Sequence, residues 1–562
     1  MDKLWLKSYP ANVKHEIDPN EYASLTDLLN QAFQKHGDSP FSVCMECWMS
    51  YKELDQLSQA LGSWFQAQGL KPGDRIAIML PNVPQFAVTM AAVLRAGYTC
   101  VNVNPLYTAR ELEHQLKDSG ATAIVILENF ASTLSEVIGH TGIQHTVLAS
   151  MGDLLGPFYG RWITFAVRHL AKMVPEFELP LHDQHKVTSF KQAIAAGRQL
   201  SFKAVSQSLD DIAFLQYTGG TTGLSKGAVL THRNIVAAIL QAETWFAPAL
   251  SRIPDLRKVN SIAALPLYHI FALTLCLLAM RQGSHLTLVP NPRDFAKFIE
   301  TLKKRPFHLL PGVNTLFNAL LQHPMFKTID FSHLCLTQAG GMAASEGTAR
   351  AWQAATGSAM IEGWGMSETC AIGTNNPVTR TSFSGNIGLP LPSIDMAIKD
   401  EAGNSLPQGD SGEICIRGPN VMVGYYKQEA ETQKAFTPDG FMRTGDVGIM
   451  DVQGYFRIVD RIKDMIIVSG FNVFPSELEN VISLCPGVLE CAVIGIPDTM
   501  QGETIKVFVV RSDSMLTEDA VARFCRDNLT GYKQPKYIEF RDELPKSNVG
   551  KILRRELRTN TH

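Results

Sequence analysis

The sequence lacks an apolar run long enough to cross a bilayer. The apolar segment that comes nearest to a membrane span is YHIFALTLCLLAM, residues 268–280. It has 13 residues, whereas a membrane helix needs roughly 20. The opening segment MDKLWLKSYPANVKHEIDPN also lacks the apolar core of a signal peptide. We therefore expect a soluble, cytoplasmic protein in which residues 268–280 form a buried helix.

The sequence also lacks a large excess of charge of either sign, and it lacks a pattern of paired cysteines. Charged residues make up 19% of the chain and the formal net charge is −3, so no basic excess indicates a nucleic-acid partner. Ten cysteines are scattered along the chain, and the C-x-x-C pair of Cys44 and Cys47 has no second pair or histidine-rich partner nearby. We expect reduced thiols rather than disulfides or a zinc site.

With 562 residues, the chain exceeds the ~250–300 residues at which a single core usually stops growing. Residues 51–130 alternate amphipathic, helix-like segments with short apolar, strand-like ones, and the alternation recurs over residues 205–345. This order predicts an α/β fold with parallel sheets covered by helices. No internal repeat or low-complexity segment interrupts it.

The texture changes after about residue 385, where short strand-like segments alternate with Gly, Asn and Asp turns. We expect an N-terminal domain over residues 1–459 whose last part, about 385–459, is a small β-rich subdomain. Residues 466–562 contain the strand-like segments AVIGIP and IKVFVVR, the helix-like EDAVARFCRDNL and a basic tail. They predict a small α+β C-terminal domain, joined through residues 460–465.

A glycine-rich segment, YTGGTTGLSKG, follows the apolar run DDIAFLQ and precedes AVLTHRNIVAAILQ, which has helical spacing. A strand, a glycine-rich loop and a helix are typical of a phosphate-binding cradle, because backbone N–H groups, hydroxyls and a cation can all point at the anion. The candidate nucleotide-binding residues of this segment are Tyr217, Thr218, Gly219, Gly220, Thr221, Thr222, Gly223, Leu224, Ser225, Lys226 and Gly227.

Other interpretations of this loop stay open at this point. A Walker A loop is excluded, because Lys226 precedes a glycine rather than a serine or threonine. The segment from Gly223 to Gly227 satisfies G-x-S-x-G, the pattern of a hydrolase nucleophile elbow, with Ser225 as nucleophile. A flexible surface loop is the third interpretation.

Further motifs follow in order: EGWGMSETC at 362–370, RTGDVG with Asp446, GYFRIVDRIKDMIIVSGFNVFPSELE at 454–479, and ELPKSNVGKILRREL with Lys551. Together with the glycine-rich loop they resemble the adenylate-forming superfamily over nearly the whole chain. Residues 439–463 are similar to the signature block of its fatty acyl-CoA synthetases. The sequence departs from that pattern at Trp364, where tyrosine is usual, and at Ala339, Ala343, Arg443 and Ile462.

The resemblance implies an ATP- and CoA-dependent ligase with Mg²⁺ as cofactor. It would convert a long-chain fatty acid into an acyl-AMP with release of pyrophosphate, then into acyl-CoA with release of AMP, feeding fatty acid degradation. A ligase for aryl or medium-chain acids shares every phosphate motif and remains an alternative. A non-catalytic binder of acyl chains or nucleotide and a serine hydrolase using Ser225 are alternatives of other classes.

The resemblance also implies roles for individual residues. Lys551 and Glu368 would be catalytic, with Thr218 and Glu368 holding the metal and Gly470 lying near the path of CoA. The remaining nucleotide-binding candidates are Gly340, Gly341, Glu362, Gly363, Trp364, Ser367, Asp446 and Arg461. We expect Trp364 to stack on adenine, Asp446 to accept the ribose hydroxyls, and Lys551 to enter and leave as the C-terminal domain swings about the hinge.

An acyl chain needs an apolar slot, for which the candidates are His269, Phe271, Leu273, Val313 and Phe317, with ordinary core as the alternative. Residues 160–174, GRWITFAVRHLAKMV, mix aromatic and basic side chains. Such a mixture is typical of a helix that lies on an anionic membrane, and a surface helix packed on the protein's own core is the alternative. Peripheral contact with the inner face of the cytoplasmic membrane and assembly as a homodimer are both left open.

Overall fold

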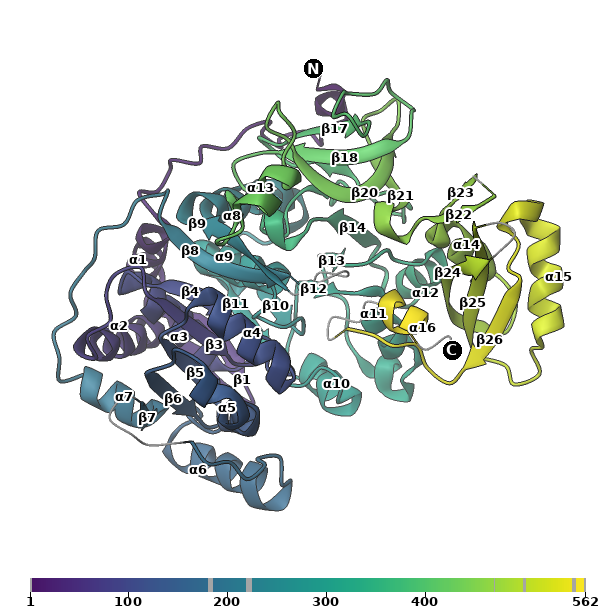
Figure 1. Cartoon of the computed structure of the whole chain (residues 1–562). Coiled ribbons are helices and arrows are strands. Elements are labelled where there is room, and N and C mark those ends of the chain that lie inside the picture. The colour runs from purple at the N-terminus through teal and green to yellow at the C-terminus, as the bar shows by residue number, and fades with distance from the viewer. Residues whose placement is uncertain are drawn as a thin grey trace.

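The computed structural model describes residues 3–179, 185–218, 225–469, 471–498, 502–547 and 552–559. The described residues form four sheets, two in a large N-terminal part, one in a small β-rich part and one near the C-terminus (Figure 1). Among these residues no helix combines the length and the apolarity that a membrane crossing requires. The predicted mixed α/β architecture, with a large and a smaller part, is confirmed.

Sheet I has the strand order β19-β9-β8-β4-β3-β5-β6-β7, and β8, β4, β3, β5, β6 and β7 are parallel. Its strands are β3 (Arg75–Met79), β4 (Thr99–Asn102), β5 (Ala123–Leu127), β6 (His145–Ala149), β7 (Lys186–Ser189), β8 (Ile212–Thr218), β9 (Lys226–Thr231) and β19 (Gly424–Tyr425). The central strands are apolar on both faces, as expected for a parallel sheet covered by helices.

Sheet II has the order β16-β15-β14-β13-β12-β10-β11-β1-β2 and is parallel from β14 to β1. Its strands are β1 (Pro40–Cys44), β2 (Cys47–Ser50), β10 (Asn260–Ala263), β11 (His285–Leu288), β12 (Leu309–Gly312), β13 (Leu336–Ala339), β14 (Met360–Trp364), β15 (Thr374–Asn375) and β16 (Leu389–Pro390). The chain crosses between sheets I and II several times, so the two belong to one unit.

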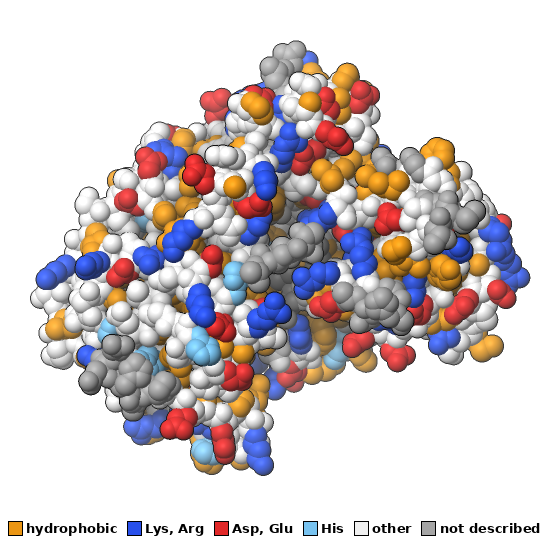
Figure 2. Space-filling view, in the orientation of Figure 1, with side chains coloured by type: hydrophobic (Ala, Val, Ile, Leu, Met, Phe, Trp, Pro, Cys, Tyr) orange, Lys and Arg blue, Asp and Glu red, His pale blue; other side chains and the backbone are white. Residues whose placement is uncertain are grey.

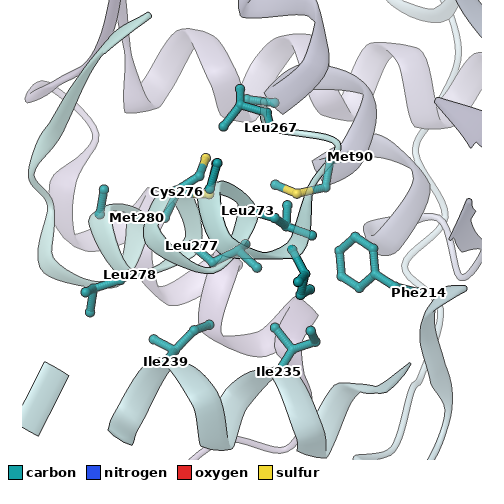
Figure 3. Close-up of a cluster of buried hydrophobic side chains, with 14 of the residues drawn as sticks. Met90, Phe214, Ile235, Ile239, Leu267, Leu273, Cys276, Leu277, Leu278 and Met280 are labelled. Atoms are coloured by element: carbon teal, nitrogen blue, oxygen red, sulfur yellow. The ribbon is translucent and has the colours of Figure 1, made fainter. Parts of the chain in front are cut away.

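Helices pack between and outside the two sheets. They are α1 (Leu25–His36), α2 (Tyr51–Ala67), α3 (Pro84–Arg95), α4 (Ala109–Ser119), α5 (Ala131–Val137), α6 (Pro157–Phe165), α7 (Phe190–Gly197), α8 (His232–Leu250), α9 (Ile270–Gln282), α10 (Phe295–Lys303), α11 (Asn314–Gln322) and α12 (Glu346–Thr356). Figure 3 shows α9 enclosed by α8 and by Met90 and Phe214, with Leu273 and Leu277 pointing into the cluster. The expectation of a buried helix over residues 268–280 is thus confirmed.

Sheet III, antiparallel, contains β17 (Asp395–Lys399), β18 (Gly412–Arg417), β20 (Met442–Met450) and β21 (Phe456–Arg461), and α13 (Glu429–Ala435) lies beside it. Sheet IV contains β22 (Ile466–Val468), β23 (Phe471–Val473), β24 (Val488–Asp498), β25 (Gly502–Arg511) and β26 (Tyr537–Arg541). The helices around it are α14 (Pro475–Ile482), α15 (Glu518–Asn528) and α16 (Arg554–Thr559). Sheet IV lies to one side of the large part in Figure 1.

The prediction of a helix directly after the glycine-rich loop is wrong. Residues Lys226–Thr231 form β9, which pairs antiparallel with β8 from Thr218 opposite Lys226 to Ile212 opposite Thr231. Helix α8 begins only at His232, where the Thr231 side chain accepts a hydrogen bond from the backbone N–H of Asn234. The loop therefore connects the strands of a hairpin. The dipole of α8, which acts over about one turn, lies a strand's length away from it.

Candidate functional site

Several of the predicted site residues that the structure describes lie at or near the ends of strands in sheets I, II and III. Strand β8 ends at Thr218, β13 ends just before Gly340, and β14 carries Glu362 and Trp364. The short 3₁₀ helix η7 (Ser367–Thr369) follows β14 and packs against β8 and β9. This face of the molecule carries a concentration of Lys and Arg side chains where the large part meets sheet IV (Figure 2). The fold thus brings segments that lie far apart in the sequence to one place.

The beginning of β9 is fixed from both sides. The backbone carbonyl of Ser225 accepts a hydrogen bond from Nε2 of His114 on α4, 2.9 Å away. The hydroxyl of Tyr217 donates to Asp118 Oδ2 at 2.5 Å, and burial raises the pKa of Tyr217 well above its ordinary value. Sequence reasoning missed His114, because the link joins residues 111 positions apart.

Lys226 is paired with a residue that no sequence motif indicated. Its Nζ forms an ion pair with the carboxylate of Glu431 on α13 and lies 5.3 Å from the ring centroid of Tyr425. Tyr425 in turn donates its hydroxyl hydrogen to Oε1 of Glu368 at 2.9 Å. A chain of contacts therefore connects the cation of the glycine-rich hairpin to the candidate metal ligand.

Glu368 is a buried carboxylate with 5% of its surface exposed. Burial raises its pKa, while the hydrogen bond from Tyr425 and the positive charges of Arg461 and Lys463 act in the opposite direction. The backbone after it is strained, because Cys370 and Ala371 have φ values of 53° and 64°, a region that non-glycine residues seldom occupy. This tight turn follows η7 and fixes Glu368 within it.

Asp446 on β20 is 3% exposed and both of its carboxylate oxygens are engaged. Oδ2 accepts a hydrogen bond from Nε1 of Trp364 at 2.9 Å, and Oδ1 lies 2.9 Å from Nε of Arg461. Each carboxylate oxygen can accept a second hydrogen bond. The carboxylate is thus held in one orientation while it keeps capacity for ligand hydroxyls.

Two of the predicted glycines allow a close approach of backbone to ring systems. A Cβ on Gly340 would lie 3.1 Å from the ring of Phe271, and Gly341 has a φ of 77° and faces Val313. Gly363 is tightly packed, since a Cβ there would lie 2.7 Å from the side-chain amide of Gln338. The positive φ of Gly341 favours glycine there, and a Cβ at Gly340 or Gly363 would require a neighbouring side chain to shift.

Glu362 lies in β14, near its end at Trp364. Burial raises the pKa of Glu362 to about 8. Its Oε2 has no hydrogen-bond partner among the described residues. Ser367 is the first residue of η7, immediately before Glu368. Glu362 is therefore a proton-bearing group at neutral pH, a property that its sequence position did not indicate.

The structure places the acyl-chain candidates in different surroundings. Leu273 and Phe317 are fully buried, Leu273 in the core of Figure 3 and Phe317 against Trp352 with ring centroids 4.8 Å apart. Phe271 is half-buried beside Gly340, and Val313 faces Gly341. His269 is half-buried and accepts a hydrogen bond from the backbone N–H of Phe271. Phe271 and Val313 thus border two of the predicted nucleotide residues, Gly340 and Gly341.

Several predicted residues lie outside the described residues: Gly219 to Leu224 of the loop, Gly470 and Lys551. The predicted hinge, residues 460–465, lies within the described residues. Asp460 is 2% exposed, and its carboxylate accepts hydrogen bonds from the backbone N–H groups of Arg461 and Ser476, each at 2.7 Å. One buried side chain thus links β21 of sheet III to α14 of the C-terminal part.

The residues suit a divalent cation that is shared with a bound polyphosphate. Magnesium is commonly held by one or two carboxylates together with phosphate oxygens. Among the described residues no group of three or more His, Cys, Asp or Glu side chains is arranged to hold a metal alone. Glu368, whose buried carboxylate has a raised pKa, gains from a nearby cation because the cation favours its charged form.

Two helix-covered parallel sheets with a smaller C-terminal sheet define an α/β enzyme with a large and a small part. The family model of the AMP-binding enzymes matches residues 29–426, and that of the AMP-binding enzyme C-terminal domain matches residues 477–551. The chain belongs to the family of AMP-binding enzymes. The resemblance seen in the sequence is confirmed.

Relatives match along nearly the whole chain. A long-chain fatty acid–CoA ligase of Escherichia coli O6:H1 is 47% identical over 560 residues, covering 99% of this chain and 98% of the relative. A long-chain fatty acid–CoA ligase of Haemophilus influenzae is 45% identical over 561 residues, with the same coverage of 99% and 98%. The crystal structure of ATP-bound MatB from Rhodopseudomonas palustris matches with a TM-score of 0.79 at 29% identity, covering 95% of this chain and 98% of that one.

Proposed function

We propose that this enzyme joins a long-chain fatty acid to CoA through an acyl-AMP intermediate. The carboxylate of the acid attacks the α-phosphorus of ATP and pyrophosphate leaves; the thiol of CoA then attacks the acyl carbonyl and AMP leaves. The observation that carries the proposal is the convergence of Lys226, Glu368 and Asp446 in one region of the fold. Identity along the full chain to the two ligases supports the choice of acid.

In the first step two anions must meet, so the site has to neutralise and position them. Lys226 and the loop that it follows are suited to the β- and γ-phosphates. Asp446, fixed by Trp364 and Arg461, is suited to the ribose hydroxyls. Gly340 and Gly341 would bring backbone against the base, which would stack on Trp364.

Glu368 and Thr218 are the residues that would hold Mg²⁺, with phosphate oxygens of ATP completing its ligands. When bound, the ion would neutralise phosphate charge that the protein's own cations leave uncompensated. Tyr425 orients Glu368 for this role through its 2.9 Å hydrogen bond.

The C-terminal part supplies Lys551 for the first step and withdraws it before the second. An ammonium on a flexible stem suits a charge that has to arrive and leave. Asp460 and Arg461, at the end of β21, would serve as the hinge between residues 1–459 and 466–562, and Gly470 would lie on the path of CoA in the second arrangement.

The acyl chain would enter beside Phe271 and Val313, which border Gly340 and Gly341. The substrate is an amphiphile, and α6 offers a surface for the membrane that holds it. Phe158 and Trp162 are 84% and 54% exposed, and Phe165 stacks on Trp162 with ring centroids 6.1 Å apart. In Figure 1 α6 lies at the lower edge of the large part, away from sheet III.

The enzymatic proposal is tested with ATP, Mg²⁺ and a C16 acid in the absence of CoA. Acyl-AMP and pyrophosphate should form in equal amounts, and a panel of aryl, medium-chain and long-chain acids should show the highest kcat/KM for long chains. Lys551→Ala should lose this step but still convert synthetic acyl-AMP and CoA. Equal loss in both half-reactions would contradict the moving lysine.

The membrane contact is tested by flotation with vesicles that contain anionic lipid. The double change Trp162→Ser and Phe165→Ser should reduce co-flotation, because it removes exposed aromatic surface next to basic side chains. The control changes Leu484 and Met515, which are 69% and 81% exposed on the C-terminal part, to serine. Equal reduction by both pairs, or by neither, would contradict a contact through α6.

A further inference from the structure

The carboxylate of Glu431 forms an ion pair with Lys226. Lys226 is the cation that the proposed function assigns to the phosphates of ATP. Glu431 Oε2 pairs with Lys226 Nζ, and Oε1 is 2.8 Å from Nζ of Lys434. The pKa of Glu431 is lowered to about 2, chiefly by the hydrogen bond with Lys226 and next by the hydrogen bond with Lys434. Glu431 is therefore an anion throughout the pH range in which an enzyme of this kind operates.

The pairing is imposed by the fold. Strand β19 pairs with β9 so that Tyr425 lies opposite Ala228, two residues after Lys226. The backbone N–H of Tyr426 adds a hydrogen bond to the carbonyl of Gly227 at 2.8 Å. This edge of sheet I fixes the segment that leads into α13.

Helix α13 is fixed to β19 by one of its own residues. Thr432 Oγ1 accepts a hydrogen bond from the backbone N–H of Tyr425 at 2.9 Å and donates to the carbonyl of Gln428 at the same distance. The methyl group of Thr432 packs on Gly424, where a Cβ would lie only 2.6 Å from it. Because Glu431 is the neighbour of Thr432, its carboxylate is held in reach of Lys226.

A polyphosphate that binds Lys226 must either displace Glu431 or share the ammonium with it. Either the displaced carboxylate turns towards Lys434 and water, or it stays near the phosphates and repels them. Both outcomes weaken the binding of any ligand with β- and γ-phosphates, and both favour its departure. A ligand without those phosphates, such as AMP, does not reach Lys226 and is unaffected.

We propose that Glu431 is an internal competitor for Lys226 that lowers the affinity for ATP and for pyrophosphate by the same factor, leaves AMP affinity unchanged, and so promotes release of pyrophosphate. This inference rests on the proposed function, since it assumes that Lys226 meets the polyphosphate. Changing ATP and pyrophosphate together is uniform binding, which alters KM and product inhibition more than the chemical step.

The test compares Glu431→Gln with wild type by calorimetric titration of the full chain with ATP, pyrophosphate and AMP. The Kd values for ATP and pyrophosphate should each fall about two- to fivefold, the size expected when one half-exposed ion pair is removed. The Kd for AMP should stay constant, and pyrophosphate should inhibit acyl-AMP formation more strongly by the same factor. Glu431→Asp, which keeps the charge, should resemble wild type.

Glu429→Gln is the matched control, because it removes the same charge from the same helix without touching the ion pair of Lys226. The inference is overturned if Glu431→Gln weakens ATP or leaves it unchanged, if AMP tightens equally, or if Glu429→Gln has the same effect. Wild-type protein that forms no acyl-AMP would overturn the proposed function itself, and this is seen before any variant is made.

Discussion

The indole Nε1 of Trp364 donates a hydrogen bond to Oδ2 of Asp446 across 2.9 Å, although the residues lie 82 positions apart. The bond connects β14 of sheet II to β20 of sheet III. Arg461 holds the other carboxylate oxygen. Tyrosine is usual at the position of Trp364 in the family that the sequence resembles, and the indole N–H supplies here a donor of fixed direction.

Trp364→Phe removes this donor and keeps an aromatic ring for the base. Because this hydrogen bond is present without ATP, its loss reaches the nucleotide only through the orientation of Asp446, and the Kd for ATP should rise by about two- to tenfold. The preference for ATP over 2′-deoxy-ATP should fall, because a loosened Asp446 discriminates ribose hydroxyls less well. Titration with both nucleotides measures this.

Trp245→Phe is the control for that change. Its Nε1 donates to the backbone carbonyl of Asn376 at 3.1 Å, in the core and away from Asp446. It should cost stability but leave the ratio of the two nucleotide affinities unchanged. A shift of the ratio by Trp245→Phe, or none by Trp364→Phe, would contradict the positioning role of Trp364.

Glu368→Gln keeps an oxygen that can accept the hydrogen bond from Tyr425 and removes the negative charge. We expect acyl-AMP formation to fall by about a hundredfold or more, the size seen when one charge-stabilising group is lost from a preorganised site. The thermal midpoint should hold or rise, because burial disfavours the charged form of Glu368. Pyrophosphate release and a thermal melt measure the two effects, and a small loss of rate would contradict the role.

Substitutions at Phe317 and Phe271 distinguish a residue of the hydrophobic core from a residue of the acyl-binding site. Phe317 is fully buried against Trp352, so Phe317→Ala should cost about 3–5 kcal/mol of unfolding free energy in urea titrations. Phe317→Leu, which is milder, should leave the chain-length profile unchanged. Phe271→Ala should change that profile at a smaller cost, and the reverse pattern would place the acyl chain against Phe317.

The stability should depend on pH through Glu362. Burial raises its pKa to about 8, whereas hydrogen bonds from the backbone N–H groups of Ala344 and Gly385 and from the Ser384 hydroxyl, and the charge of Arg380, lower it. Between pH 4.5, the ordinary value, and pH 8 the folded chain binds the proton more tightly than the unfolded chain. Stability from this group is therefore complete below pH 4.5 and is lost as pH rises to 8.

Glu362→Gln removes this dependence. The difference in thermal midpoint between variant and wild type should grow in favour of the variant from pH 5 to pH 8 and then level off. His232 contributes in the acid range with the opposite sign: burial lowers its pKa to about 4, so stability falls as pH drops from 6.5 to 4 in both proteins. A constant difference between the two proteins would contradict the raised pKa of Glu362.

Local patterns in the sequence were sufficient for most elements of the fold. The apolar alternation over residues 51–130 gave α2, β3, α3, β4, α4 and β5 in the observed order, because helix and strand periods depend on neighbouring residues. The ordered motifs placed Glu368, Asp446 and Lys226 in one site through the family resemblance. The same local reasoning failed at Lys226–Thr231, where a run compatible with a helix forms β9 because it pairs with β8.

The sequence by itself determined the α/β class and the family, and it predicts the residues for phosphate, ribose and metal, since these depend on residue type and short spacing. Only the tertiary structure decided that Glu431 meets Lys226 across 205 positions and that Trp364 meets Asp446 across 82. Strand pairing and helix packing bring such residues together, and the free energy that favours those contacts comes from cores and sheet ladders elsewhere in the chain. For that reason neither partner shows the other in its own stretch of sequence.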